Sequence, residues 1–245
     1  MYRNILIKIN HDAMVNEALI EIITEEVLRT IHQGSDVIAQ TATDNCIPLG
    51  VSNRHIHLTK ETFKKLFGQE ADIEKMTPLY QPKEFASKQT LTIIGTKQRA
   101  ISNVRILGPL RNYDQVEISL TDARVLGIDA PVANSGDLSN AAPLTLVGPA
   151  GSVYLERCAI VASRHIHMSS QDAERFGVKE GDYCRVRISG EKTTVFEDVL
   201  VRVKDGWYLQ IHLDTDDGNA ANVRSDTKVE FLGKMEHHEA GSCSR

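Results

Sequence analysis

The chain has 245 residues, of which 41% are hydrophobic and 25% are charged, which is typical of a soluble globular protein with one large or two small domains. Its formal net charge of -5 provides no overall basic field, and this argues against nucleic acid and anionic membranes as partners. No apolar run approaches the ~18 residues that span a bilayer, and charged and amide side chains interrupt the first ten residues, so we expect neither a secretion signal nor a transmembrane helix.

The first predicted element is an amphipathic helix over residues 12–32. Val15, Leu19 and Ile22 recur at helical spacing, with acidic side chains among them. A Gln-Gly-Ser-Asp sequence ends this helix, and a polar stretch at 40–45 separates it from the rest of the chain. Two roles stay open for the helix: packing on the parent domain, or docking on another protein.

A His-Ile-His strand follows, inside segment 51–59, and a near-identical segment recurs at 161–169. Successive side chains of a strand point to opposite faces, so His55 and His57 share one face, as do His165 and His167. A single His-x-His pair is more often a polar strand face than a ligand pair. Duplication at one offset, with an arginine before each pair, instead predicts two homologous halves that hold metal between them.

Each histidine strand should lead into a short helix. Both segments carry a hydroxyl residue suited to N-capping, an acid in the first turn and a glycine at the end. These are Thr59, Glu61 and Gly68 in the first copy, and Ser169 or Ser170, Asp172 and Gly177 in the second.

The rest of the chain beyond residue 46 is rich in predicted strands. Alternating or β-branched patterns occur at 90–94, 104–107, 116–120, 144–147 and 184–188. Many short strands, few helices and an internal repeat predict a mainly β protein made of two small β-barrels with short capping α-helices, plus the N-terminal amphipathic helix. No glycine-rich loop of the nucleotide-binding type is present.

Three further positions could carry chemistry. Arg111 lies on a turn, Glu117 lies in the strand that follows it, and His212 ends a strand-like run at 207–212. Glu117 alone could equally be a solvated strand residue. The acidic residues Asp214, Asp216 and Asp217 lack the spacing of a calcium loop, and we interpret them as turn residues.

Cysteine chemistry has little support in this sequence. Cys46, Cys158, Cys184 and Cys243 lie far apart and form no Cys-x-x-Cys pair, which argues against a thiolate zinc cluster or a disulfide framework and favours a reducing cytoplasm. No Gly-x-Ser-x-Gly elbow is present either, so a nucleophilic serine has no sequence signal.

Taken together, the His-Ile-His repeats, the sequence Gly-Pro-Leu-Arg-Asn-Tyr-Asp-Gln-Val-Glu and the sequence Gln-Ile-His-Leu-Asp-Thr-Asp resemble the phosphate propanoyltransferase family, the phosphotransacylases of bacterial microcompartments. The resemblance covers residues 46–233. It implies acyl transfer, propanoyl or acetyl, between coenzyme A and inorganic phosphate at a two-metal site, usually zinc, between two β-barrels.

The resemblance also assigns roles to individual residues of this chain. It implies that His55 and His57 bind one metal, that Glu117, His165, His167 and His212 bind the other, and that Arg111 binds phosphate. For coenzyme A it implies the segment Val51, Ser52 and Asn53 together with Lys97, Arg105 and Asn219, with Arg99 a rival for the place of Lys97.

The same resemblance implies interleaved domains. One barrel would combine residues 44–53 with 163–234, and the other would span 54–162, leaving residues 1–43 as the N-terminal helix and linker and 235–245 as a flexible tail. It also implies that the helix at 12–32 is an encapsulation peptide, so we expect a cytoplasmic protein held inside a microcompartment by shell or core proteins. The helix could also promote homo-oligomer formation.

Two other functions stay open from the residues themselves. A dinuclear metallohydrolase could use the same ligands, and a non-catalytic scaffold could use metal to join two barrels. Acyl preference, metal identity, reaction direction and oligomeric state have no sequence signal.

Overall fold

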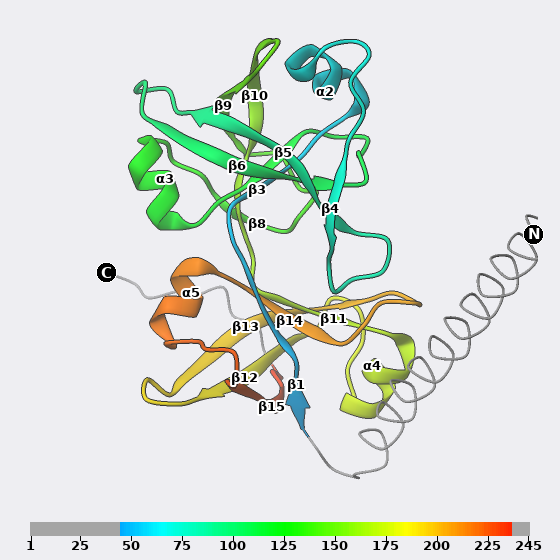
Figure 1. Ribbon diagram of the computed structural model, residues 1–245. Helices are drawn as coiled ribbons and strands as arrows, with labels where there is room; N and C mark the ends of the chain where they lie inside the picture. The colour runs from blue at the N-terminus through cyan, green and yellow to red at the C-terminus, as the bar shows by residue number, and fades with distance from the viewer. Residues whose placement is uncertain (1–44, 237–245) are drawn as a thin grey trace, which may run out of the picture. The chain divides into compact units, whose positions relative to one another are not determined.

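Residues 45–236 are described by a computed structural model, shown in Figure 1. The helix predicted at 12–32 lies outside these residues, as does most of the predicted tail. Among the described residues, no helix is both long and apolar enough to cross a membrane.

The first of two sheets closes into a six-stranded barrel. Two short strands, β4 (Lys75–Pro78) and β8 (Val132–Ala133), extend it, pairing with β5 and β10. The barrel strands in spatial order are β5 (Phe85–Ile94), β6 (Ala100–Gly108), β3 (His55–His57), β7 (Gln115–Glu117), β10 (Gly151–Ala162) and β9 (Ala142–Gly148), and pairing of β9 with β5 closes the ring.

The second sheet has seven strands and curls into a half-barrel. Its first and last strands in spatial order, β1 and β2, come from the start of the described chain, whereas the other five follow β10. The order is β1 (Cys46–Ile47), β15 (Lys228–Lys234), β12 (Tyr183–Ser189), β13 (Thr194–Val203), β11 (His165–Met168), β14 (Gln210–Asp214) and β2 (Leu49–Ser52). The mainly β architecture predicted from the sequence is confirmed, with one barrel closed and the other open.

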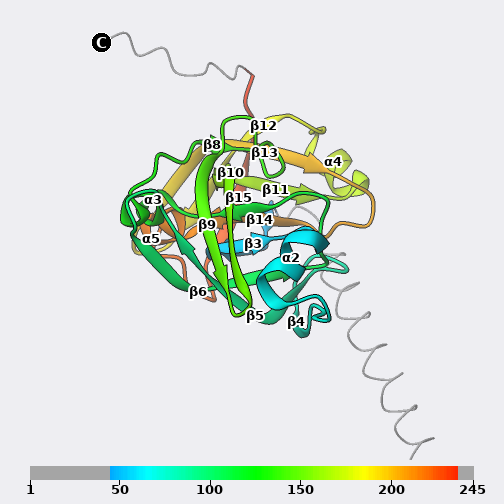
Figure 2. The same cartoon turned by 90° about the horizontal axis from the view of Figure 1, so that it is seen from above.

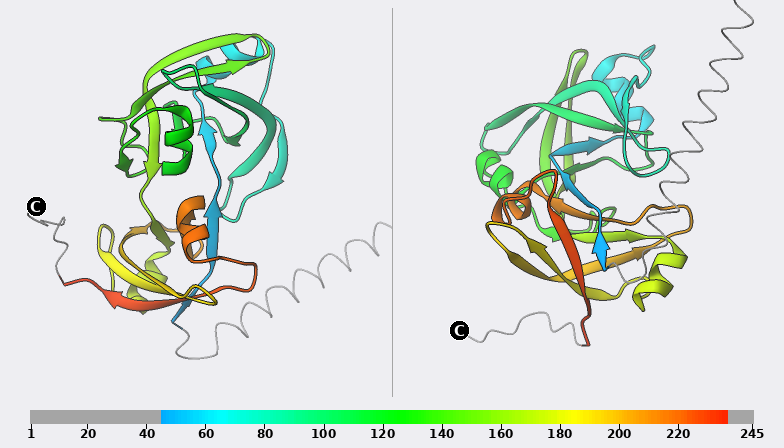
Figure 3. Two further views of the ribbon diagram at one scale, coloured as in Figure 1. Left: turned by 90° about the vertical axis from the view of Figure 1, so that its left-hand side faces the viewer. Right: turned by 60° about the horizontal axis from the view of Figure 1, so that its bottom comes forward.

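The chain passes between the two sheets twice, from β2 to β3 and from β10 to β11 (Figure 3). Each passage is immediately followed by a His-Ile-His strand. Both histidine strands therefore begin where the sheets meet, which brings the two copies of the motif toward each other.

Each sheet packs its own hydrophobic core. Ile56 of β3 and Val116 of β7 are fully buried in the barrel core, and Ile166 of β11 and Ile211 of β14 are fully buried in the core of the half-barrel. Because side chains alternate along a strand, anchoring these apolar residues in the cores turns the flanking histidines toward the other face.

Within residues 45–236, four short helices follow the strands that carry candidate metal ligands: α2 (Lys60–Phe67), α3 (Leu120–Leu126), α4 (Ser170–Phe176) and α5 (Thr215–Ala220). In the view of Figure 2, the β9–β10 hairpin runs across the barrel between α2 and α3. The predicted caps are confirmed: Thr59 accepts a hydrogen bond from the N–H of Thr62, Ser169 forms a capping box, and the helices stop at Gly68 and Gly177.

Two local predictions were wrong. The strand expected to reach residue 120 ends at Glu117, because Ser119 caps α3 in a second capping box with Asp122. The acidic segment read as a turn forms α5, with the Asp214 side chain accepting from the N–H of Asp217. In both places an N-cap at or just after the end of the strand starts a helix: Ser119 lies two residues after β7, and Asp214 is the last residue of β14.

Candidate metal centre

Strand register sets the positions of the candidate metal ligands. Antiparallel pairing of β3 with β7 places Glu117 directly opposite His55. Antiparallel pairing of β11 with β14 places His212 directly opposite His165 in the same way. Each half of the structure thus contributes a histidine pair and a third residue from the neighbouring strand.

These residues form two triads, His55–His57–Glu117 and His165–His167–His212. Within each triad, one candidate donor atom per residue lies within 4.8 Å of the others. The sequence resemblance had grouped Glu117 with His165, His167 and His212, but the structure groups it with His55 and His57. The physical reason is the β3–β7 register, which joins residues more than 60 positions apart in the sequence.

The ring nitrogens of the triads are arranged as metal ligands require. The Nδ1 atoms of His55 and His165 lie 2.8 Å from the carbonyl oxygens of Asn53 and Ser163. Since a carbonyl can only accept, these Nδ1 atoms carry the proton and the Nε2 lone pairs face the site. Buried ring nitrogens without a hydrogen-bond partner complete the sets: Nδ1 of His57, Nδ1 of His167 and Nε2 of His212.

Burial keeps His57, His165, His167 and His212 neutral. Desolvation, followed by the charge of neighbouring imidazoles, lowers the pKa of His167 to about 2 and the pKa of His212 to about 3. Desolvation also lowers the pKa of His165 and holds the pKa of His57 well below its usual value. Neutral imidazole is the form that ligates metal, and each buried lone pair without a donor is satisfied when a cation binds. The residues therefore fit a metal ion in each triad.

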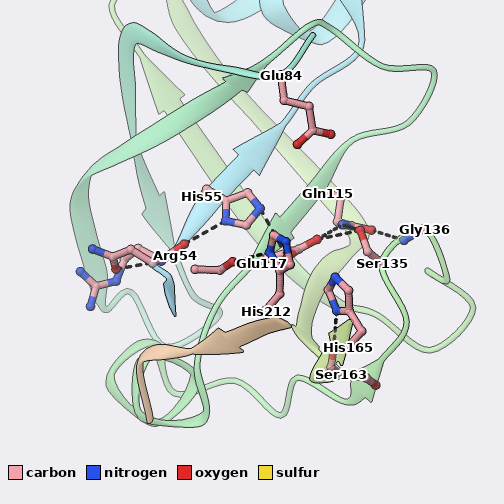
Figure 4. Close-up of polar contacts among 12 residues, drawn as sticks. Arg54, His55, Glu84, Gln115, Glu117, Ser135, Gly136, Ser163, His165 and His212 are labelled. Atoms are coloured by element: carbon pink, nitrogen blue, oxygen red, sulfur yellow. Dashed lines mark hydrogen bonds and ion pairs between the residues drawn. The ribbon is translucent and has the colours of Figure 1, made fainter. Parts of the chain in front are cut away.

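Glu117 is held on its far side by donors (Figure 4). Its Oε1 accepts hydrogen bonds from Nε2 of Gln115 at 2.6 Å and from Oγ of Ser135 at 2.7 Å. The Gln115 amide is fixed in turn by the Gly136 N–H, at 2.7 Å. Oε2 of Glu117 remains directed at the triad, 3.4 Å from Nε2 of His55.

The arginine that precedes each histidine pair contacts the second helix of the same half, which follows the strand carrying the third triad residue. Arg54 forms an ion pair with Asp122 of α3 at 2.7 Å, and Arg164 lies 3.7 Å from Asp217 of α5. Both carboxylates occupy the third position of their helices. The two halves therefore repeat the same support for the ligand strands.

A cavity of about 590 Å³ opens over both triads and is lined by all six of their residues. Arg111 also lines it, and its guanidinium donates to Glu84 at 2.9 Å and to the hydroxyl of Tyr113 at 2.7 Å. The structure thus brings Arg111 to the same cavity as the histidines, as the resemblance implies.

The residues predicted to contact coenzyme A divide into two groups. Val51, Ser52, Asn53 and Arg105 line the cavity. Lys97, its rival Arg99 and Asn219 do not line it: Lys97 packs on Gly127 after α3, and Asn219 lies in α5.

Sequence reasoning missed several residues of the cavity. Among the polar and aromatic ones are Glu84, Tyr113, Ser135, Arg202 and Trp207; Gln115, which holds Glu117, was missed as well. Tyr113 and Gln115 stand inside a motif that was already noted, so their spacing from Glu117 was an available signal. Glu84 and Arg202 reach the cavity only through strand pairing and loop packing, for which the sequence has no local signal.

Comparisons with known proteins agree with this geometry. A family profile described as phosphate propanoyltransferase matches residues 48–224. A phosphate propanoyltransferase of Lachnoclostridium phytofermentans is 44% identical over 213 residues, covering 87% of this chain and 98% of that protein. Those of Thermotoga maritima and Shewanella putrefaciens are 43% and 48% identical, covering 81% and 80% of this chain and 95% and 92% of theirs. The chain therefore belongs to the phosphate propanoyltransferase family and is a phosphate acyltransferase.

Proposed function

We propose that this enzyme moves a propanoyl group between coenzyme A and inorganic phosphate in the cavity over the two histidine triads. The observation that carries this proposal is the meeting of both triads and Arg111 in one cavity large enough for a substrate. The names of the relatives support propanoyl as the acyl group, and acetyl is the natural smaller alternative.

We further propose that each triad holds one divalent ion, and that zinc is the ion. Imidazole and carboxylate ligands suit zinc, and the buried unpaired nitrogens of His57, His167 and His212 support its binding. Three protein ligands for each ion leave a fourth position open, which is typical of catalytic rather than structural zinc.

When bound, the metal ions would supply Lewis acidity for the thioester carbonyl and for the departing thiolate. The chain itself contributes orientation and charge. Arg111 would bind phosphate through charge-assisted hydrogen bonds, and Glu84 and Tyr113 fix the direction of its guanidinium. Phosphate is already an anion at neutral pH, so the site needs no strong general base.

In the proposed reaction a phosphate oxygen attacks the thioester carbonyl carbon. The new C–O bond forms, the C–S bond breaks, and acyl phosphate and the coenzyme A thiolate leave as products. The thiols of Cys158 and Cys184 are completely buried, and burial raises the pKa of each to about 12. This supports direct transfer to phosphate rather than an acyl-enzyme formed at either cysteine.

The proposed coenzyme A site follows the cavity wall at Val51, Ser52, Asn53 and Arg105. Arg105 donates to the carbonyls of Ser87 and Lys88, which orients its side chain. Lys97 and Asn219 remain proposed contacts for the distant part of a molecule longer than the cavity.

The experiment that tests this function follows thiol release from propanoyl- and acetyl-coenzyme A, with and without phosphate, before and after metal chelation. Release that needs both phosphate and metal is the expected result. Phosphate-independent release would indicate a hydrolase, and no release at all would favour a scaffold. Parallel measurement of metal content checks the two-ion proposal.

A further proposal concerns location. We propose that residues 12–32 direct the enzyme into a bacterial microcompartment through shell or core proteins. The amphipathic pattern supports this role. Co-sedimentation of the whole chain with shells, and its loss when residues 1–43 are deleted while activity persists, would be the expected outcome. Retention by the shortened chain would reject it.

A further inference from the structure

Arg202 of β13 is a cavity residue with no role assigned so far. Parallel pairing of β13 with β11 places Arg202 in register with His167. Its half-buried side chain lines the same cavity as both triads and Arg111. The guanidinium therefore lies beside the all-histidine triad.

The other cavity arginines already have acceptors within the protein. Arg54 is paired with Asp122, Arg105 donates to two backbone carbonyls, and Arg111 is paired with Glu84. Within residues 45–236, no hydrogen bond or ion pair joins the Arg202 guanidinium to an acceptor. The guanidinium carbon lies over the face of Trp207, 5.7 Å from the ring centroid.

A half-buried cation without a counterion beside three imidazoles is unfavourable by itself, and its planar set of N–H donors matches an oxyanion. The Arg111 charge, in contrast, is already offset by Glu84. An anion entering this end of the cavity would therefore gain more from Arg202 than from any other arginine in its lining.

Arg202 and Arg111 line the same cavity as His167. Trp207 stacks on His167 with ring centroids 4.1 Å apart and holds Arg202 over its face. This packing restrains the guanidinium before any anion arrives.

We propose that Arg202 is a second phosphate-binding residue, which with Arg111 holds inorganic phosphate, or the phosphoryl group of the acyl phosphate, beside the His165–His167–His212 triad. This inference rests on the proposed acyl transfer to phosphate. Coenzyme A carries phosphates too, so the test must separate the two sources of the same chemistry.

The test compares Arg202→Ala and Arg202→Lys with Lys204→Ala as the matched control. Lys204 lies 5.5 Å from the centroid of the same Trp207 ring but is exposed and does not line the cavity. The KM for phosphate and the KM for propanoyl-coenzyme A are measured separately, together with phosphate binding by calorimetry without acyl substrate.

For Arg202→Ala we expect a KM for phosphate raised ~10-fold or more and weaker phosphate binding, because charge-assisted hydrogen bonds are lost. The KM for propanoyl-coenzyme A should stay near wild type. Arg202→Lys keeps the positive charge but lacks the planar set of donors, so its KM for phosphate should lie between those of wild type and Arg202→Ala. Lys204→Ala should match wild type in both KM values. This control shows whether the loss of a cation beside Trp207 is enough to change the KM for phosphate, or whether the cation must also line the cavity.

Two outcomes would overturn the inference: an unchanged KM for phosphate in both Arg202 variants, or a rise confined to the KM for propanoyl-coenzyme A, which would assign the guanidinium to coenzyme A. Failure of the proposed function itself is distinguishable, because wild-type protein would then show no phosphate-dependent thiol release.

Discussion

Glu117 occupies in the barrel the position that His212 occupies in the half-barrel. Each lies opposite the first histidine of its pair across an antiparallel ladder, and each stands two residues before the N-cap of a helix. The equivalence makes the two candidate metal sites alike in geometry and different in charge, since one triad carries a carboxylate and the other is neutral.

The first prediction follows from this difference. Glu117→Gln should reduce the metal content from about two ions per chain to about one, because an amide replaces the charged ligand of one triad. The loss of affinity should exceed the roughly 10–100-fold that is typical of outer-shell changes. Metal analysis after dialysis measures it.

The control for that variant is Glu156→Gln, which removes an exposed carboxylate of β10. It should keep both ions. Two ions retained by Glu117→Gln would show that Glu117 is not a ligand and would leave its hydrogen bonds with Gln115 and Ser135 as its only role.

The second prediction concerns pH and the metal-free protein. His167 and His212 have folded-state pKa values of about 2 and about 3, below the ~6.5 of an unfolded histidine. At pH values between the folded-state and unfolded-state pKa, the unfolded chain binds more protons at these two histidines than the folded chain does. Their contribution to the free energy of unfolding is therefore fully present above pH ~6.5 and is lost as the pH falls toward 3. For these two residues the loss from pH 7.5 to pH 5.5 is roughly 2–3 kcal/mol.

Urea unfolding of chelated protein at the two pH values measures this loss. In the variant His212→Asn the pH dependence should become shallower, because one buried titrating group is gone. A free energy of unfolding that does not change between pH 7.5 and 5.5 would contradict the prediction.

The third prediction concerns Arg111. Arg111→Ala should lower phosphate-dependent turnover by ~10²-fold or more with metal content preserved, because it removes the oriented charge that holds phosphate. Arg187→Ala is the matched control: its ion pair with Glu230, at 3.0 Å, resembles that of Arg111 with Glu84, but it lies on the surface of the half-barrel. Wild-type turnover in folded Arg111→Ala protein would remove Arg111 from the site.

The local parts of the structure could be predicted from the sequence. The caps at Thr59 and Ser169 and the stops at Gly68 and Gly177 depend on residues within one or two turns. The sequence predicted three of these positions outright and left Ser169 and Ser170 as alternatives for the second cap. The histidine pairs were equally readable, because alternation along a strand fixes their shared face. A local pattern gave a wrong prediction at Ser119. The strand alternation continues past this residue, but its side chain caps a helix, and the cap determines the structure.

The partners of these local features could not be predicted in the same way. That Glu117 joins His55 depends on the register of β3 against β7, and that Arg202 reaches the cavity depends on β13 lying beside β11. Such pairings join distant segments, and a shift of one residue would turn either side chain to the opposite face. The fold class was accessible from the number and spacing of strands, but the membership of each triad was not.

The last prediction compares the two arginines that precede the histidine pairs. Arg54 makes two contacts with Asp122, at 2.7 and 2.9 Å, and the Asp122 side chain is only 4% exposed, so Arg54→Ala leaves a buried carboxylate without its cation. Because Arg54 itself is 36% exposed, we expect a destabilisation of about 1–3 kcal/mol rather than the larger cost of a fully buried pair. Arg164 makes one longer contact with a more exposed Asp217, so Arg164→Ala should cost within ~1 kcal/mol. Urea unfolding of the metal-loaded variants measures the free energy of unfolding of each. Equal losses in the two variants would contradict the prediction, because they would show that the shorter, more buried Arg54 pair stabilises its half no more than the Arg164 pair does.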